Sequence, residues 1–599
     1  MLIENICIDF GTSNTVISYI EDGIIKQIDD DFTGQSLIPS SIYLNNSIFT
    51  EKKELKNLIP NKDYLIGNNA NEYAKNDSLL YFYEFKRFLG ISEKTKHIYN
   101  DFLQRYPYNY IFKSDILNFS IIKEEYELKI SVIDLVRLYF DAIYIILKNK
   151  LNIVGDIEII LTCPAYFNDL QRNQLRIGVE RSNFKIFKIF NEPTSAVIYY
   201  INYMNNKNDN KDNNTDDNKD DLNKKITKEN LNDIGERIIK SGNNIYIVYD
   251  IGGGTTDVTV VRYMNDDNIC EVIDTDGNNA LGGIDIDELI RDKIYEKYNI
   301  DYNNTKWKYK TKKLAEAIKI KLTFNNKHDI YLEDVPIKDT KTSKIIVKDE
   351  LKIIFTRQEF NNLINNLANQ LLEPFKRIYE KYETNNIVLI GGPNKIPLIY
   401  EKMNSITNNN AIIIDDKNNN INIYKTIVSE GGCLLYNFIK NKSLYVLDII
   451  PMNIGICDGH NDMIIMIEKN KKIPVTIEKI FTTNYDCQRV IDVEIFEGMN
   501  ELCEKNVMIG SYQICGVPPQ KKGEIIIKLK FSINKNGILD VSIVGSANVN
   551  ESTRKDDSFK LDNKIKIIPT SLRDDLIKRI LSKNKEKKVE QSENSEQIV

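Results

Sequence analysis

The chain has 599 residues, of which 42% are hydrophobic and 28% charged, so it is long enough to form several globular domains. Its formal net charge of −6 argues against a protein that binds nucleic acid. No long uncharged apolar run occurs and the first apolar segment begins almost at once, so we expect no membrane span, no signal peptide and a cytoplasmic location.

The first segment, IENICIDFGTSNT at residues 3–15, is an apolar strand followed by a small polar loop. The loop contains Asp9, Gly11, Thr12 and Ser13. A glycine lets backbone N–H groups approach an anion, hydroxyls donate to phosphate oxygens, and a carboxylate can hold hydrated Mg²⁺. Alone, such a loop is equally typical of an ordinary Gly-rich hairpin tip.

The next segments predict buried strands and helices with polar residues at their ends. Lys86 lies in an aromatic-rich stretch whose apolar neighbours would aim its head group inward. Residues 131–150 have the pattern of an amphipathic core helix. Apolar runs at 157–163 and 186–190 predict strands, and Glu192 follows the second at a turn before a helix.

Residues 205–243 break this pattern because they are polar and of low complexity. We expect a surface insertion that is disordered at least over residues 205–224, since it has little apolar surface to bury.

The same pattern, an apolar strand followed by a loop with Asp, Gly and Thr, occurs again at residues 244–261, NNIYIVYDIGGGTTDVTV. Here the strand ends at Asp250 and leads into Gly252, Gly253, Gly254 and Thr255, with Asp257 two residues on. Two such hairpins far apart in the chain indicate an internal duplication that clamps one polyphosphate from both sides. A third strand-to-Gly loop at residues 386–397, with Gly391 and Gly392, suits the sugar and base side of a nucleotide.

Residues 356–381 predict a helix capped by Thr356 and Glu359, and the character of the chain changes only beyond residue 450. An apolar stretch, SLYVLDII, follows at Ser443–Ile450. Residues 451–545 then consist of short strands broken by turns, which predicts a β-sandwich, and a last amphipathic helix is expected from near Ser571. The eight cysteines form no CxxC pair and are expected to be buried free thiols of a reducing compartment.

The motifs IDFGTSNT, EFKRFLG, CPAYFND-QR, NEPTSA, YDIGGGTTDV, ALGGIDID and IGGPNKIP, followed by the linker and sandwich, resemble those of the heat-shock protein 70 (DnaK-type) family. The resemblance implies a multidomain α/β plus all-β fold: an actin-like two-lobed ATPase domain, a β-sandwich peptide-binding domain and a short helical tail. The implied divisions are an ATPase domain at 1–442 with the 205–243 insertion, a linker at 443–449, a sandwich at 450–569 and a truncated helical lid at 570–599.

The resemblance also implies roles for individual residues around ATP or ADP with Mg²⁺, and leaves room for K⁺. Lys86, Glu192, Asp250, Asp9 and Thr255 would be catalytic, and Asp9 and Asp250 would hold Mg²⁺ through water. The nucleotide would be bound by Gly11, Thr12, Ser13, Gly252, Gly253, Gly254, Asp257, Gly282, Gly283, Glu316, Lys319, Thr323, Gly391, Gly392 and Lys395. Pro164 and Arg172 would relay the state of the γ-phosphate to the linker.

The implied partners are unfolded or extended polypeptides, a J-domain co-chaperone and a nucleotide exchange factor, in a chaperone with a stress-response role. The linker residues expected to dock are Leu444, Val446, Leu447 and Asp448. The peptide would contact Ile456, Phe481, Ile491 and Val493.

Two departures from the family pattern leave an alternative open. Ile320 and Lys395 stand where arginines would sandwich the adenine, and the loop Asp458–Asp462 is more acidic than usual. A regulatory or scaffold protein of the same fold, with weak ATPase and weak peptide binding, is therefore the second hypothesis. A sugar kinase on the same fold is disfavoured because it would leave the linker and sandwich unexplained.

Overall fold

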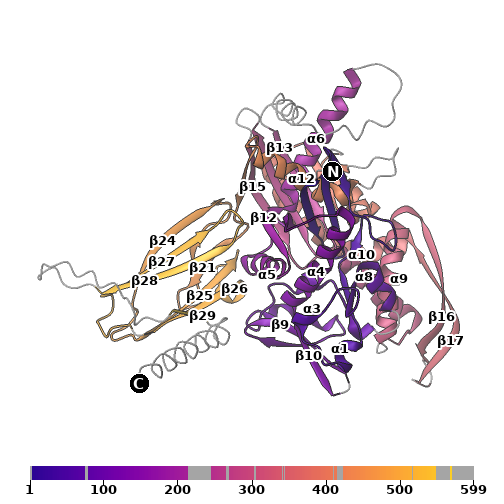
Figure 1. The fold of residues 1–599 in the computed structure, drawn as a ribbon, viewed down its shortest axis with the longest axis horizontal. Coiled ribbons are helices and arrows are strands. Elements are labelled where there is room, and N and C mark those ends of the chain that lie inside the picture. The colour runs from indigo at the N-terminus through magenta and orange to yellow at the C-terminus, as the bar shows by residue number, and fades with distance from the viewer. Residues whose placement is uncertain are drawn as a thin grey trace, which may run out of the picture.

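A computed structural model describes residues 3–74, 78–123, 125–212, 244–264, 269–301, 305–339, 342, 344–408, 411–413, 423–515, 517–547 and 567–569 (Figure 1). The expected lid at 570–599 and most of the expected insertion lie outside these residues. Helix α6, Glu192–Asp212, runs into the start of the insertion, so residues 205–212 are helical and the expectation of disorder from residue 205 is wrong there.

The first lobe is built on a sheet with the strand order β12-β11-β1-β2-β3. Strands β1 and β2 form an antiparallel hairpin, and β11 and β12 continue the sheet in parallel on the other side of β1. The bounds are β1 Ile3–Phe10, β2 Asn14–Glu21, β3 Ile24–Gln27, β4 Ile38–Pro39 beside β2, β11 Ile157–Cys163 and β12 Phe184–Asn191.

The second lobe repeats this topology. Its sheet has the order β19-β18-β13-β14-β15, again a three-strand antiparallel meander flanked by two parallel strands. The bounds are β13 Asn244–Ile251, β14 Thr256–Met264, β15 Ile269–Asn278, β18 Ile387–Ile390 and β19 Ala411–Ile413. The duplication inferred from the two Gly-rich loops is therefore present in the strand order of the two sheets.

Smaller elements surround the two sheets. In the first lobe these are α1 Ser47–Thr50, β5 Ser41–Leu44, β6 Tyr64–Ile66, α2 Gly67–Tyr73, β7 Tyr81–Tyr83, α3 Asn100–Gln104, β8 Asn109–Lys113, β9 Ile116–Lys123, β10 Tyr126–Ser131, α4 Val132–Leu151 and α5 Asp169–Glu180, with 3-10 turns at Leu55–Asn57, Ser78–Leu80, Phe85–Phe88 and Lys96–Tyr99. In the second they are α8 Gly283–Tyr298, α9 Thr305–Phe324, the hairpin β16 Lys327–Lys338 and β17 Ile345–Thr356, α10 Arg357–Tyr382, a 3-10 turn Gly392–Lys395 and α11 Pro397–Ile406. Helix α12, Ile423–Lys440, packs on β1, β2 and β11 of the first sheet and on α6.

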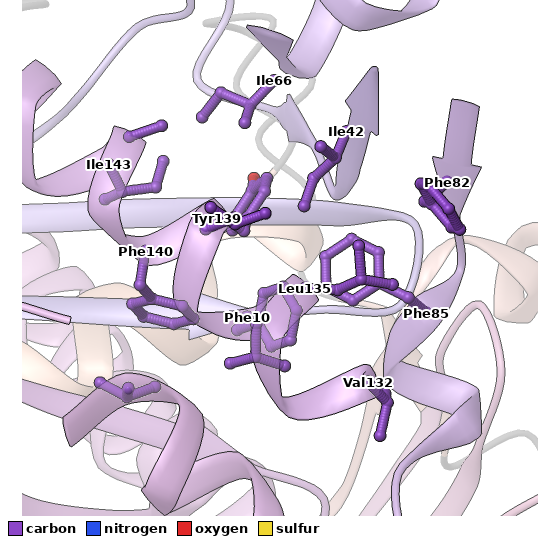
Figure 2. Close-up of a cluster of buried hydrophobic side chains, with 14 of the residues drawn as sticks. Phe10, Ile42, Ile66, Phe82, Phe85, Val132, Leu135, Tyr139, Phe140 and Ile143 are labelled. Atoms are coloured by element: carbon purple, nitrogen blue, oxygen red, sulfur yellow. The ribbon is translucent and has the colours of Figure 1, made fainter. Parts of the chain in front are cut away.

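Apolar side chains fix the first strand against the helix that covers it. Phe10, the last residue of β1, packs with Phe85 and with Phe140 of α4, at ring-centroid distances of 5.7 and 5.4 Å (Figure 2). This cluster holds the strand end rigidly, because side chains in such interiors are close-packed. Asp9 and the loop after Phe10 are thereby positioned by the core rather than by the loop itself.

Helix α10 begins as predicted. Thr356 caps it by accepting from the Glu359 backbone N–H at 3.2 Å, while the Glu359 carboxylate accepts from the Thr356 backbone N–H at 2.9 Å. The predicted helix at residues 131–150 is α4. No helix in the described part of the chain is both long and apolar enough to cross a membrane.

The linker is a strand of the second sheet. Strand β20, Tyr445–Ile449, pairs in parallel with β15 and antiparallel with β23, Lys472–Ile473, which belongs to the C-terminal part. Leu444, just before the strand, and Ile449, its last residue, are buried in the apolar cluster shared by α6 and α12. The apolar stretch therefore joins the two parts through backbone pairing.

The C-terminal part is a β-sandwich, drawn in orange to yellow beside α5 in Figure 1. One sheet has the order β22-β21-β25-β26-β29 and the other β24-β27-β28. The bounds are β21 Asn453–Cys457, β22 Met463–Ile467, β24 Val475–Thr482, β25 Val490–Gly498, a 3-10 turn Cys503–Lys505, β26 Val507–Cys515, β27 Ile525–Ile533, β28 Leu539–Ala547 and β29 Ile567–Pro569.

A glycine on α12 allows two helices to approach closely, which generates a stability prediction. A Cβ atom on Gly431 would lie 1.9 Å from the Ser195 carbonyl oxygen of α6, so Gly431→Ala must push the helices apart. We expect a loss of about 2 kcal/mol in the stability of the N-terminal domain, measured by thermal unfolding. Gly392→Ala is the matched control, because no atom lies within 4 Å of its Cβ position. Equal unfolding temperatures for the two variants would contradict this packing.

Candidate functional site

The tips of the two repeated hairpins meet. Each is closed by the same bond: the Gly11 N–H donates to the Asn14 carbonyl at 3.0 Å, and the Gly252 N–H donates to the Thr255 carbonyl at 3.0 Å. A Cβ atom on Gly253 would lie 2.4 Å from the Ser13 hydroxyl oxygen, so the two tips touch across the space between the lobes. The two hairpin tips that the sequence predicted to act together therefore lie at one site.

The start of α8 supports the second tip from behind. The Gly283 and Ile284 N–H groups donate to the carbonyls of Gly252 and Gly253, at 2.9 and 2.8 Å. A Cβ on Gly282 would lie 2.7 Å from the Gly253 carbonyl oxygen, so this position accepts only glycine without a shift of the backbone. Gly282 therefore supports the loop and does not line the cleft.

A cleft of about 1380 Å³, counted out to its open mouth, lies between the lobes. The predicted residues that line it are Asp9, Gly11, Thr12, Ser13, Lys86, Glu192, Asp250, Gly252, Gly253, Thr255, Gly283, Glu316, Lys319, Thr323, Gly391, Gly392 and Lys395. Gly254 instead packs against Arg87 and Thr12, and Asp257 accepts the Tyr166 backbone N–H at 2.9 Å.

Buried carboxyl groups surround one lysine at the floor of the cleft. Lys86 is 3% exposed and its Nζ lies 3.2 Å from Glu192 Oε1. Burial, reinforced by Glu192, raises the pKa of Asp9 to about 7 and that of Asp257 to about 7. Burial and the same glutamate raise the pKa of Asp250 well above its usual range. Four acids facing one ammonium group leave the part of the cleft around Lys86 short of positive charge, while Lys319 and Lys395 line the cleft elsewhere.

This charge deficit fits a hydrated divalent cation. In the described part of the chain, no three His, Cys, Asp or Glu side chains converge closely enough to hold a metal ion directly. Asp9 Oδ1 already accepts the Thr162 hydroxyl at 2.8 Å. Mg²⁺ keeps several of its waters and binds through one or two carboxylates plus phosphate oxygens, which is what Asp9 and Asp250 at the two hairpins can offer.

The third Gly loop also lines the cleft and lies beside the end of β13. Gly391 has φ of +82°, and a Cβ there would lie 2.1 Å from the Ile251 carbonyl oxygen, so this turn requires glycine. Lys395 Nζ lies 3.7 Å from the Tyr424 ring centroid. Lys319 Nζ donates to the Gly283 carbonyl at 3.0 Å and to Asp287 at 2.7 Å. Sequence reasoning missed Tyr424, because it follows no motif.

Arg87 joins the two lobes beside the hairpins and was not predicted as a site residue. Its Nη2 donates to the Ala280 carbonyl at 2.9 Å and lies 3.3 Å from Asp285. Because Arg87 comes from the first lobe and both partners from the second, this contact ties the lobes together at the phosphate end. The adjacent basic pair Lys86–Arg87 was the available signal.

A hydrogen-bonded route leads from the cleft to the linker. Arg172 donates to the carbonyls of Pro164 and Ala165, at 3.4 and 3.1 Å, and to Asn191 Oδ1 at 2.6 Å. The Asn191 amide donates in turn to Asp448 of the linker at 2.6 Å. Asn191 directly precedes Glu192, so the route starts beside the Lys86 ion pair.

Comparison with known proteins identifies the family. A family model described as Hsp70 protein matches residues 5–599. The chain belongs to the Hsp70 family. It is 28% identical over 557 residues to the chaperone protein HscA of Buchnera aphidicola subsp. Baizongia pistaciae (strain Bp), a match that covers 90% of this chain and 91% of the relative. Hsp70 membership carries the expectation of a two-lobed ATPase domain and a β-sandwich, and the observed sheets are consistent with it.

In this Hsp70 protein the sandwich contacts α5 through two carboxyl groups. Glu497 of β25 accepts the Asp169 backbone N–H at 2.8 Å, and Asp169 accepts the Leu539 backbone N–H at 2.6 Å. Burial raises the pKa of Glu497 to about 8 and that of Asp169 to about 6, while Arg172 opposes both shifts. The sequence did not predict this contact, because neither segment contains a motif that indicates the other as its partner.

The four residues predicted to contact peptide gather in the apolar cluster of the sandwich. Ile456 and Val493 are 6% and 5% exposed, and Phe481 and Ile491 are partly buried against the same cluster. The structure brings these four together, and their role in binding stays a prediction.

The Glu497 contact predicts that docking of the sandwich depends on pH. With a pKa of about 8 when docked and 4.5 as its ordinary value, Glu497 takes up a proton on docking between these limits. Docking is strongest below the lower value and weakens by up to about tenfold per pH unit as pH rises towards 8. Energy transfer between dyes on the two domains measures this.

The matched variant for this experiment is Glu497→Gln, which keeps the acceptor oxygen for Asp169 and cannot ionise. It should flatten the pH dependence of docking between pH 6 and 8, where Asp169 has largely lost its proton. An unchanged pH profile in this variant would refute the assignment to Glu497.

Proposed function

We propose that this Hsp70-family chain is an ATP-dependent molecular chaperone that binds extended apolar segments of unfolded proteins. Its two hairpin tips, their acids and Lys86 suit a triphosphate held with Mg²⁺. The β-sandwich suits a peptide ligand. The observation that carries the proposal is the link from the cleft to the linker: Asn191, the neighbour of Glu192 in the chain, accepts from Arg172 and donates to Asp448 of the linker.

In the proposed nucleotide site, the backbone N–H groups and hydroxyls of Thr12, Ser13 and Thr255 bind phosphate oxygens, and Asp9 and Asp250 orient the metal through its waters. Mg²⁺, when bound, neutralises charge on the β- and γ-phosphates. The protons that burial retains on Asp9 and Asp257 are displaced once this positive charge is present.

In the proposed hydrolysis, this chain's side chains position and stabilise rather than react covalently. Lys86 donates to the transferring phosphoryl group and to the attacking water, in a site where water is excluded and a charge therefore acts strongly. Glu192 holds Lys86 in place through the 3.2 Å contact. A fixed ammonium group of this kind lowers the barrier because it needs no reorganisation at the moment of reaction.

In the proposed coupling, the linker reports the state of the cleft. Asn191 is the common partner of Arg172 and Asp448, so a shift of Glu192 towards or away from phosphate moves the residue that holds the linker. The nucleotide then changes docking only through such differential contacts. The structure corresponds to the docked arrangement, with β20 paired to both domains.

In the proposed substrate site, an extended peptide binds by backbone hydrogen bonds and by a pocket for an apolar side chain, near Ile456, Phe481, Ile491 and Val493. A J-domain co-chaperone and a nucleotide exchange factor are the partners proposed for the cycle, in the cytoplasm. The scaffold hypothesis differs by predicting nucleotide binding without peptide-dependent turnover.

The decisive experiment measures ATP turnover with and without an apolar peptide in the wild type, in two test variants and in one control variant. The wild type should be stimulated by peptide. Lys86→Ala should lose about 100-fold or more of its turnover, because a charged donor to the phosphoryl group is removed. Asp448→Ala should keep its basal turnover and lose the stimulation, because the linker no longer holds Asn191.

Lys94→Ala, an exposed lysine eight positions from Lys86, is the matched control and should behave as wild type. Peptide stimulation that persists in Asp448→Ala would refute the coupling route. Tight ATP binding by the wild type with no turnover under any condition would refute the chaperone proposal in favour of the scaffold.

A further inference from the structure

A tight turn of the sandwich is attached to a neighbouring loop. The turn between β21 and β22, residues 458–462, lies against residues 501–505, which follow β25. The Cys503 N–H donates to the Asn461 carbonyl at 2.8 Å, and the Met463 N–H donates to the Glu501 carbonyl at 2.8 Å. The Glu504 N–H also donates to Asn461 Oδ1 at 3.0 Å. These bonds keep the two loops in register.

Two thiols face each other at this junction. Cys457 is the last residue of β21, opposite Met463 in the hairpin, and Cys503 opens the 3-10 turn that bonds to Asn461. The two thiol groups lie close enough for Cys457 to act on Cys503. Cys457 is half-buried, whereas Cys503 is 1% exposed. The hydrogen bonds from residues 461 and 463 to residues 501, 503 and 504 hold the two loops beside each other.

We propose that Cys457 and Cys503 are an oxidisable dithiol, whose disulfide ties the 458–462 turn to the 501–505 loop. Neither residue belongs to the nucleotide site or to the relay. Both are free thiols in the structure, which is the reduced form of the pair. The oxidant is a peroxide, or a small-molecule disulfide such as oxidised glutathione.

The chemistry follows from the unequal exposure of the two thiols. Cys457, the accessible one, attacks hydrogen peroxide as its thiolate, and gives a sulfenic acid and one water. The Cys503 sulfur then attacks the Cys457 sulfur, the S–S bond forms, and the hydroxyl leaves as a second water with the Cys503 proton. Two thiols lose two electrons and two protons, and the peroxide becomes two waters.

The order of these steps agrees with the surroundings of Cys503. Burial, reinforced by contact with Cys457, raises the pKa of Cys503 to about 12, so it is a poor first nucleophile. With a disulfide as oxidant, exchange at Cys457 followed by attack of Cys503 gives the same product and two reduced thiols.

The consequence for substrate rests on the proposed function. The 458–462 turn directly follows Cys457 and Ile456, and Ile456 is placed in the proposed peptide site. A covalent tie restricts opening of this turn, because it removes conformations that the reduced loop can visit. Oxidation is therefore expected to slow peptide release by at least about tenfold.

Two other sets of cysteines provide internal controls. Cys7 and Cys433 also contact one another but are both fully buried in the N-terminal domain, so they should stay reduced in the native protein. Cys487 is exposed and should react with any oxidant that enters solution. Selective linkage of Cys457 to Cys503 then reports this site and not general oxidation.

The test treats the full-length protein with hydrogen peroxide, alkylates the remaining thiols and maps the peptides by mass. A 457–503 crosslink, lighter by two hydrogen atoms, is expected in the wild type and in neither Cys457→Ser nor Cys503→Ser. Hydrogen exchange of residues 458–463 should slow in the oxidised wild type alone. Oxidation of Cys487 while Cys457 and Cys503 stay reduced overturns the proposal, and so does a crosslink that leaves exchange unchanged.

Release of a fluorescent apolar peptide completes the test, with Cys457→Ser as the control. Slower release from the oxidised wild type, with no change in the variant, supports the gating effect, and equal release rates overturn it. A crosslink with slowed exchange but no peptide binding in either state supports the dithiol and refutes the chaperone proposal, so the two failures are distinguishable.

Discussion

The constraint on which the structure depends is a shortage of positive charge between the two lobes. Glu192, Asp250 and Asp257 are buried, and Asp9 is half-buried, around a single ammonium group, Lys86. Buried charges without partners are costly, and the raised pKa values of the three aspartates express that cost. A cleft of this kind is relieved by a bound cation, and the two opposed hairpins offer a triphosphate a place beside it.

The remaining architecture keeps that arrangement in place and connects it to the sandwich. The duplicated sheets deliver one aspartate each from the end of a central strand, and the core around Phe10 and α4 makes the strand end rigid. Asn191, next to Glu192, accepts from Arg172 and donates to Asp448 on the linker strand. That strand pairs with β15 of the second lobe and with β23 of the C-terminal part.

The sequence predicted those parts of the fold that are determined by residues close together in the chain. The Asp-x-Gly ends of the two strands, the Thr356 capping box and the Gly391 turn are specified by residues within a few positions of each other. The end of α6 was mispredicted, because the lack of apolar surface to bury was taken to decide the outcome and the helix nonetheless continues to Asp212.

Features that depend on docking could not be predicted from the sequence. Glu497 and Asp169 are 328 positions apart and meet only because the sandwich packs on α5. Cys457 and Cys503 likewise meet through the pairing of two loops, and their spacing follows no known pattern. Tyr424 of α12 contacts Lys395 of the third Gly loop. The pairing of the linker strand also depends on the strands β15 and β23 beside it in space, and not on the composition of the linker.

The most direct test of the charge argument is the number of protons released when Mg²⁺ and ATP bind. Calorimetry at pH 7, in buffers of different ionisation enthalpy, gives this number from the slope of the binding heat. With the pKa values of Asp9 and Asp257 at about 7, these two groups are about half protonated in the empty cleft, so we predict release of at least about one proton, and less at pH 9. Binding of Mg²⁺ and ATP with no proton release at pH 7 would contradict the account.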